Sequence, residues 1–266
     1  MNTLVVTNVR GGMCDRLALM LFAYKISKIC KRLLVAHWPV NRACGSPFER
    51  LFKTNAFPVF SENSYTPDLD IRPPIPLNFD LSLKKIVSTD VSVIQLAGYH
   101  GHNFDDFQSV FSFSEEVLEI ANNFSKTYLT SEAIGLQVTV GKKRTQGIYA
   151  PSLDKYIETV DSVISQRGEV IFLSTDDPVV ISPLRHQFGN RIQVLPMRSY
   201  DRSTTDSVID AAASLHLLRS CKCVVGSSVS GFSILAGWDT KYIHVRGKNC
   251  INTDWWGNQI RLRNEI

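Results

Sequence analysis

The serine-rich segment that follows Val224 and Val225 has the composition of an anion-binding turn. It reads Gly226-Ser227-Ser228-Val229-Ser230-Gly231-Phe232-Ser233, an apolar run that passes into small residues before a helix begins. Small residues let a phosphate approach the backbone, and free N–H groups at a helix start attract negative charge. The simpler interpretation is an N-cap serine in a tight turn. Four serines within seven residues favour phosphate binding, by Ser227, Ser228, Ser230, Gly231 and Phe232.

A second polar segment, Ser174-Thr175-Asp176-Asp177, follows the apolar residues Phe172 and Leu173. A carboxylate at the end of a strand could accept hydrogen bonds from a base edge or a ribose hydroxyl. Ser174, Thr175 and Asp176 are therefore candidate contacts of a nucleotide. The alternative is that Ser174, Thr175 or Asp177 only caps the helix that follows Pro178.

A glycine turn near the N-terminus, Arg10-Gly11-Gly12-Met13-Cys14-Asp15-Arg16, precedes a long helical pattern. It has neither the G-x-G-x-x-G nor the G-K-[ST] signature, which argues against an NAD or ATP site. Asp15 could act as a general base, and Arg16 could hold a phosphate. The alternative is an aspartate that complements the helix dipole, followed by a surface arginine.

Two histidines, His100 and His102, lie in the segment Gly98–Phe104 near Asp105 and Asp106. Nothing in a loop fixes the geometry of such a set, so we expect no metal site here. We interpret His100 as part of a hydrogen-bonding loop on the acceptor side.

Alternating strand and helix patterns must position these segments. Strands are expected at 4–9, 33–38, 91–96, 134–140, 170–173, 192–195, 223–225 and 242–245, and helices at 17–31, 114–128, 152–165, 178–188, 205–219 and 231–237. Residues 39–90 read as loops and short pieces, punctuated by prolines. This order predicts an α/β protein with parallel sheets. We expect two Rossmann-like domains that face each other across a cleft, residues 1–128 on the acceptor side and residues 129–266 binding the nucleotide.

The composition is that of an ordinary globular protein of 266 residues, 44% hydrophobic and 20% charged. A net charge of +4 suits an anionic ligand but is too small to indicate a nucleic-acid partner. The six cysteines form no zinc pattern and are expected to be free thiols. The start of the sequence does not read as a signal peptide, and no run reaches the roughly 20 apolar residues of a membrane span. We therefore expect a cytoplasmic protein.

Taken together, the segments resemble the GT-B-fold fucosyltransferases: the nodulation, core α1,6-, α1,2- and protein O-fucosyltransferases. Residues 10–17 are similar to the opening G-G-x-x-N-R-L of that superfamily, with Asp15 in the usual place of asparagine. Residues 98–104 are similar to the G-Y-F-Q segment of the α1,2 group, and residues 171–177 to an F-x-x-T-D-D strand end. Residues 206–236 are similar to the block D-x-x-x-x-L-x-x-C-x-x-x-V-x-x-x-x-S-x-F-S-x-x-A, the most specific of these matches.

One strand departs from the superfamily pattern. The family strand I-G-x-H-x-R-R-G-D supplies the arginine that holds the donor diphosphate, whereas Gln137 here takes the place of the histidine, and Thr139 and Val140 take those of the arginines. Loss of that arginine removes charge stabilisation from a departing diphosphate. We expect Lys142, Lys143 or Arg144, in the basic turn that follows, to reach the phosphates. Alternatively the turn is only solvated, and the protein uses another donor or has lost catalysis.

The resemblance implies an inverting, metal-independent glycosyltransferase. Its donor substrate would be a nucleoside-diphosphate sugar, possibly GDP-fucose, and its acceptor an oligosaccharide or other glycan, with no separate cofactor. Two other classes remain open: a non-catalytic protein that binds sugar nucleotides or glycans, and an epimerase. The sequence has neither the dinucleotide fingerprint nor the Tyr-x-x-x-Lys pair that an epimerase needs.

Overall fold

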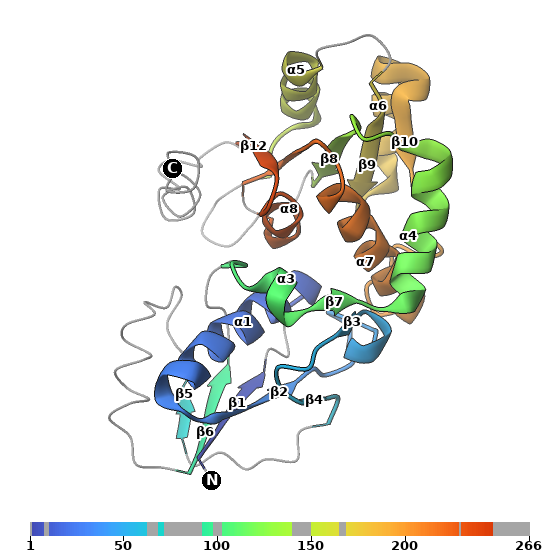
Figure 1. Cartoon of the computed structure of the whole chain (residues 1–266). Helices are drawn as coiled ribbons and strands as arrows, with labels where there is room; N and C mark the ends of the chain where they lie inside the picture. Colours follow the sequence, from blue (N-terminus) through green and yellow to red (C-terminus); the bar gives the residue numbers. More distant parts are fainter. Residues whose placement is uncertain are drawn as a thin grey trace. The chain divides into compact units, whose positions relative to one another are not determined.

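The computed structural model describes residues 2–7, 11–62, 69–71, 92–97, 103–139, 150–164, 169–228 and 230–246. The chain forms two compact units (Figure 1). The first combines Met1–Ile120 with Met197–Ala213, and the second combines Ala121–Pro196 with Ser214–Ile266. The boundary between Ala213 and Ser214 falls inside helix α7, Thr205–Arg219.

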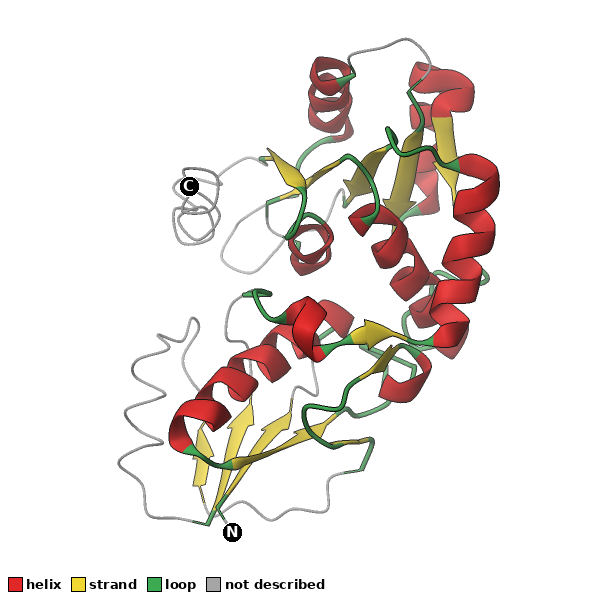
Figure 2. Ribbon diagram, in the orientation of Figure 1, coloured by secondary structure: helices red, strands yellow, loops and turns green. Residues whose placement is uncertain are grey.

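The first unit is built on a five-stranded parallel sheet of order β4-β2-β1-β6-β5. Its strands are β1 (Thr3–Thr7), β2 (Leu33–His37), β4 (Val59–Phe60), β5 (Leu69–Ile71) and β6 (Val93–Ala97). Helix α1, Met13–Cys30, packs on β1 and β2 (Figure 2). The helix begins after Gly12 and ends at Lys31, whose φ of 53° is left-handed. All five residues of β1 are buried, as expected for a strand in a parallel sheet.

Short elements complete the first unit. They are a 3₁₀ turn (Phe48–Arg50), α3 (Phe107–Val110) and the antiparallel pair β3 (Phe52–Lys53) and β7 (Ser112–Phe113). An aromatic cluster joins them, made of Phe48, Phe52, Phe57, Phe107, Phe111 and Phe113. The segment 197–213 is bonded to the rest of this unit at Gly45, whose N donates to Arg202 O at 2.8 Å and whose O accepts from the Thr205 hydroxyl at 2.9 Å.

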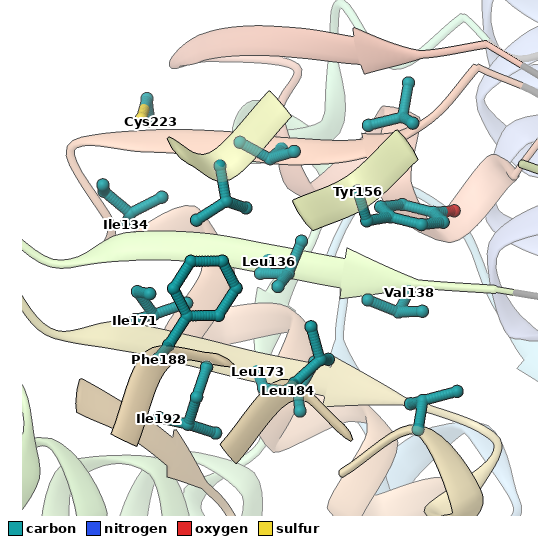
Figure 3. Packing of buried hydrophobic residues seen from close by; sticks show 14 residues of the cluster. Ile134, Leu136, Val138, Tyr156, Ile171, Leu173, Leu184, Phe188, Ile192 and Cys223 are labelled. Atoms are coloured by element: carbon teal, nitrogen blue, oxygen red, sulfur yellow. The ribbon is translucent and has the colours of Figure 1, made fainter. Parts of the chain in front are cut away.

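The second unit is built on a five-stranded parallel sheet of order β10-β9-β8-β11-β12. Its strands are β8 (Ile134–Val138), β9 (Ile171–Thr175), β10 (Ile192–Val194), β11 (Cys223–Ser227) and β12 (Lys241–Val245). Helix α5 (Leu153–Val163) packs on the middle of the sheet, α6 (Ile181–Phe188) on β10 and α8 (Gly231–Ala236) on β11. Helix α4, Glu115–Tyr128, leads into this unit. Figure 3 shows the core, where Leu136 and Leu173 of neighbouring strands lie among Tyr156, Leu184 and Phe188.

The α/β class with parallel sheets is confirmed. Helix α7 has its predicted bounds, and the other main elements differ from prediction by a few residues at their ends. The helix predicted from Pro178 begins instead as a 3₁₀ turn, Pro178–Val180, and becomes α-helical at Ile181. Short strands lie within 39–90, where the prolines indicated only loops and short pieces. Domain boundaries at residue 128 and a cleft between the domains remain predictions.

Candidate functional site

The carboxyl edge of the second sheet brings the predicted nucleotide-binding segments together. In chain order the strands run 3-2-1-4-5 across the sheet, which is the Rossmann order. Ser174 of β9, Gln137 of β8, Gly226 of β11 and His244 of β12 lie side by side in register. Strand order reverses between β8 and β11. Open α/β sheets bind their ligands beyond the carboxyl ends of strands at such a switch point.

The serine-rich turn leaves β11 at this switch point. Ser228 N donates to Val245 O at 3.3 Å, and Ser230 N donates to Ser227 O at 3.2 Å, so backbone bonds hold the turn. Ser230 is the N-cap of α8, because its side-chain oxygen accepts from Ser233 N at 3.4 Å. The capping interpretation therefore holds for Ser230. Gly231 and Phe232 form the first turn of this six-residue helix and are partly exposed.

Ser228 differs from its neighbours in the turn. Its residue is 4% exposed, and within the described part of the chain its buried hydroxyl has no hydrogen-bond partner. Leaving a buried hydroxyl unsatisfied costs about 1–3 kcal/mol, so such a group marks a place where a bound molecule could supply the partner. Among the predicted contacts that the structure describes, Ser228 has a buried hydroxyl to which a bound molecule could supply the hydrogen-bond partner.

At the end of β9, one of the two aspartates has a structural partner. The Asp177 carboxylate accepts from Val179 N at 3.1 Å and caps the 3₁₀ turn. Thr175 Oγ1 accepts from Asp177 N at 3.1 Å, which shapes the same turn. Ser174, Thr175 and Asp176 are partly exposed, and Oδ1 of Asp176 is buried. The structure thus places these three residues beside the end of β8 and gives the capping role to Asp177.

The strand that departs from the superfamily pattern has buried polar side chains. Gln137 is 5% exposed and Thr139 is 3% exposed. Gln137 Nε2 donates to Thr139 Oγ1 at 3.1 Å, and Gln137 Oε1 accepts from the Ser233 hydroxyl. Both side chains are therefore bonded inside the unit. Sequence reasoning missed the partner Ser233, whose only signal was its membership of the serine-rich segment.

Two further groups at this edge were not predicted, Tyr242 and His244 of β12. The Tyr242 hydroxyl donates to Ser227 O at 2.9 Å. The ring centroids of Tyr242 and His244 are 4.3 Å apart. Burial raises the pKa of Tyr242 well above its usual range, and a hydrogen bond with Ser233 opposes that rise. Burial, with the nearby charge of Arg246, lowers the pKa of His244 to about 4. Neither group carries charge at neutral pH.

In the first unit, Asp15 lies at the start of α1, where the glycine turn leaves β1. Asp15 Oδ2 accepts from Gly12 N at 3.2 Å, so the carboxylate satisfies one free N–H of the helix start. Asp15 remains partly exposed. The first sheet also reverses its strand order beside β1, between β1 and β6. Asp15 therefore caps α1. It also follows β1, one of the two strands between which the strand order of the first sheet reverses.

Arg16 is a buried structural residue rather than the surface arginine of the alternative interpretation. It is 2% exposed. Its Nε donates to Gly11 O at 2.9 Å, and its two terminal nitrogens donate to Pro39 O and Asn41 Oδ1. The guanidinium carbon lies 5.1 Å from the centroid of the Trp38 ring. Burial lowers the pKa of Arg16, and the side chain ties the glycine turn to the segment after β2. A role toward a phosphate remains a prediction.

Several predicted residues lie outside the described part of the chain, namely Val140, Lys142, Lys143, Arg144, His100 and His102. Among the residues that are described, no three His, Cys, Asp or Glu side chains form a group that could hold a metal ion. No described helix combines the length and the apolar character needed to cross a bilayer. The five cysteines in the described ranges are free thiols.

No protein-family model matches the sequence, and no curated protein matches it by sequence. Solved structures do match. The fucosyltransferase NodZ from Bradyrhizobium superposes with a TM-score of 0.65 at 14% identity, covering 89% of this chain and 93% of that chain. POFUT1 in complex with GDP-fucose superposes with a TM-score of 0.61 at 14% identity, covering 92% and 98%. A variant of Arabidopsis thaliana FUT1 in complex with GDP gives 0.61 at 12% identity, covering 96% and 72%. The fold is therefore that of the GT-B fucosyltransferases, as predicted.

Proposed function

We propose that this protein is a glycosyltransferase that transfers a sugar, in the first place fucose, from a GDP-linked donor to a glycan acceptor. The observation that carries the proposal is the buried, unsatisfied hydroxyl of Ser228 at the switch point of a Rossmann-order sheet. The fold adds support, since NodZ has been soaked with GDP-fucose and POFUT1 has been solved with it.

The donor would bind at the carboxyl edge of the second sheet. Ser228, together with the backbone around Ser230 and Gly231, would bind the diphosphate. Asp176, with Ser174 or Thr175 beside it, would accept hydrogen bonds from the ribose or the base. The chemistry needs positive charge on the departing diphosphate. Gln137 and Thr139 cannot supply it, because both are neutral and bonded within the unit. That role falls to Lys142, Lys143 or Arg144.

In the first unit, Asp15 would be the general base that takes the proton of the acceptor hydroxyl. Its carboxylate is partly exposed at the start of α1. A positioned base of this kind contributes about 10²–10⁴-fold to the rate. His100 would bind the acceptor. The reaction would be inverting and would use neither a metal ion nor a cofactor besides the donor.

The second candidate is a protein that binds a sugar nucleotide or glycan without catalysing transfer. The neutral, internally bonded Gln137 and Thr139 favour it, because they replace the cationic strand of the resembled enzymes. In that case GDP or GDP-fucose would still bind, but the sugar would stay on its nucleotide.

A panel of nucleotides separates these outcomes. Thermal unfolding and calorimetry with GDP, UDP, dTDP and CMP sugars should show selective binding of the GDP ligands. A ligand at 100 times its Kd adds about 2.7 kcal/mol to the free energy of unfolding, which is easily measured. Release of GDP from GDP-fucose in the presence of a glycan mixture supports the transferase. Binding without release supports the second candidate, and absence of binding to every nucleotide overturns the donor site.

A further inference from the structure

Five neutral side chains gather at the carboxyl edge of the second sheet, held by hydrogen bonds to one another and to the backbone. We call this set the Gln137 network, and its members are Gln137, Thr139, Tyr156, Ser233 and Tyr242. Four of the five are at most 5% exposed. The network reaches β8, α5, α8 and β12, and through Tyr242 it also reaches the backbone of β11.

Gln137 is the centre of this network. Its amide oxygen accepts from the Ser233 hydroxyl of α8, and its amide nitrogen donates to Thr139 Oγ1 at 3.1 Å. On one side, Tyr156 OH donates to Thr139 O and accepts from Thr139 N, each at 3.2 Å. On the other side, Tyr242 lies close to Ser233, and its hydroxyl donates to Ser227 O at 2.9 Å. Removing the amide therefore breaks the network in the middle.

Helix α8 is held by the buried side chains of Ile234 and Leu235 and by Arg219, which donates to Leu235 O at 2.7 Å. At its start it is held by the bond between Ser233 and Gln137. It has six residues, and isolated helices shorter than about 12 residues are marginal in water. The helix packs directly on the backbone of β11, since a Cβ added to Gly226 would lie 2.8 Å from Ser233 Cβ. Gly226 has no side chain that could bond to Ser233. In the first turn of the helix, the Ser233 hydroxyl donates to Gln137 Oε1 of β8, the strand beside β11.

The serine-rich turn moves with this helix. Ser230 caps α8 and is bonded through its backbone to Ser227, so a shift of α8 displaces the turn that carries Ser228. Gln137 itself is 5% exposed, and both ends of its amide are bonded to protein. It can influence a bound molecule only through the elements that it holds.

We propose that Gln137 is a positioning residue of the nucleotide site, which it serves by holding Ser233, and with it α8 and the serine-rich turn, against the end of β8. This rests on the proposed donor site. Loss of the amide should loosen the turn and weaken nucleotide binding without removing any group that touches the nucleotide.

Gln137→Met tests this, because methionine keeps the length of the side chain and removes both hydrogen bonds. Ser233→Ala removes the other half of the central bond with little change in volume. Gln95→Met is the matched control, a buried glutamine (7% exposed) in β6 of the first sheet. Two quantities are measured in each protein: the Kd for GDP by calorimetry, and the hydrogen-exchange rates of the Ile234 and Gly237 amides, which donate within the helix.

Either Gln137→Met or Ser233→Ala should raise the Kd for GDP about threefold to tenfold, the worth of one net hydrogen bond. Because the two changes break the same bond, the double variant should bind GDP only slightly less tightly than the single variant with the lower GDP affinity. Exchange at Ile234 and Gly237 should be faster in both variants. Gln95→Met should leave the Kd for GDP unchanged. It should speed exchange at Ile234 and Gly237 no more than its effect on overall stability requires.

Unchanged exchange at Ile234 and Gly237 in both variants would overturn the positioning role, whatever happens to GDP. Unchanged GDP affinity together with faster exchange would overturn its link to the nucleotide. Should the wild-type protein bind no nucleotide, the proposed donor site fails, and the exchange rates still decide whether Gln137 holds the helix. Ser233→Ala keeps the test available if Gln137→Met does not fold.

Discussion

The backbone of Gly45 lies directly against the backbone of Ser203. Gly45 N donates to Arg202 O at 2.8 Å, and a Cβ built on Gly45 would lie 2.0 Å from Ser203 O. We expect Gly45→Ala to lower the free energy of unfolding by about 3 kcal/mol or more, since backbone atoms cannot swing aside as a side chain can. Denaturant titration measures the effect. Gly12→Ala is the control, because its nearest neighbour would be 3.9 Å away, and it should cost less than about 1 kcal/mol. Equal losses would show that this close approach does not fix the segment 197–213.

Asp15→Asn separates the two roles of Asp15. Asparagine keeps an oxygen for the Gly12 N–H, so stability should stay nearly unchanged, whereas an amide cannot take a proton. If Asp15 is the base, kcat for sugar transfer should fall about 10²–10⁴-fold with an unchanged Kd for GDP. Asp154→Asn, a matched change in the first turn of α5, should leave kcat alone. Full activity in Asp15→Asn would show that Asp15 caps the helix and is not the general base.

Ser228→Ala should have opposite effects on folding and on binding. Removing a buried hydroxyl that lacks a partner should leave the free energy of unfolding unchanged or raise it by up to about 1 kcal/mol. The Kd for GDP should rise about threefold to tenfold, because the ligand loses a hydrogen bond. Ser114 is the comparison, with the same 4% exposure but a hydroxyl that donates to Arg50 O at 2.8 Å. Ser114→Ala should cost about 1 kcal/mol and leave GDP affinity intact. A destabilised Ser228→Ala that binds GDP normally would remove Ser228 from the site.

His244 predicts a loss of stability in mild acid. Its pKa is about 4 in the folded protein and about 6.5 in an unfolded chain. The folded state therefore binds fewer protons than the unfolded state in this window, so the free energy of unfolding falls as pH drops from 6.5 toward 4. The shift corresponds to at most about 3 kcal/mol. Urea titrations at pH 7.5 and 4.5 should show a smaller acid loss in His244→Gln than in the wild type. The same loss in both proteins would place the acid sensitivity elsewhere.

Much of the fold could be predicted because its elements have clear local signals. Helix α7 has its predicted bounds, β1 and β8 are buried throughout, and β2 is buried from Leu34 to Ala36. The two-residue strands β3, β4 and β7 could not be predicted, because so short a segment has no periodicity and forms only when a distant partner pairs with it. The assignment of 197–213 to the first unit depends on contacts such as those of Gly45 with Arg202 and Thr205, which no local pattern encodes.

The place of the candidate residues in the sheet was predictable, but their hydrogen bonds were not. Strand ends followed by small polar residues indicated where ligands bind in parallel sheets, and Ser174 and Ser227 do lie at that edge. The spacing of the serines could not show which one caps the helix and which one lacks a partner, since that depends on bonds such as Ser230 with Ser233. Likewise, the sequence showed only that Gln137 takes the place of a histidine in the family strand. Its bond with Ser233 of α8 could not be predicted, because it depends on how the helix packs on the sheet.

The Gln137 network keeps a constant charge state beneath the serine-rich turn. Glutamine, threonine and serine do not titrate, phenols ordinarily lose their proton only near pH 10, and burial raises the pKa of Tyr242. With His244 neutral above about pH 4, the bonds that hold α8 and the serine-rich turn stay the same from mild acid to mild alkali. A change of nucleotide affinity across that range would therefore report the ionisation of the ligand's own phosphates, or of residues outside the network.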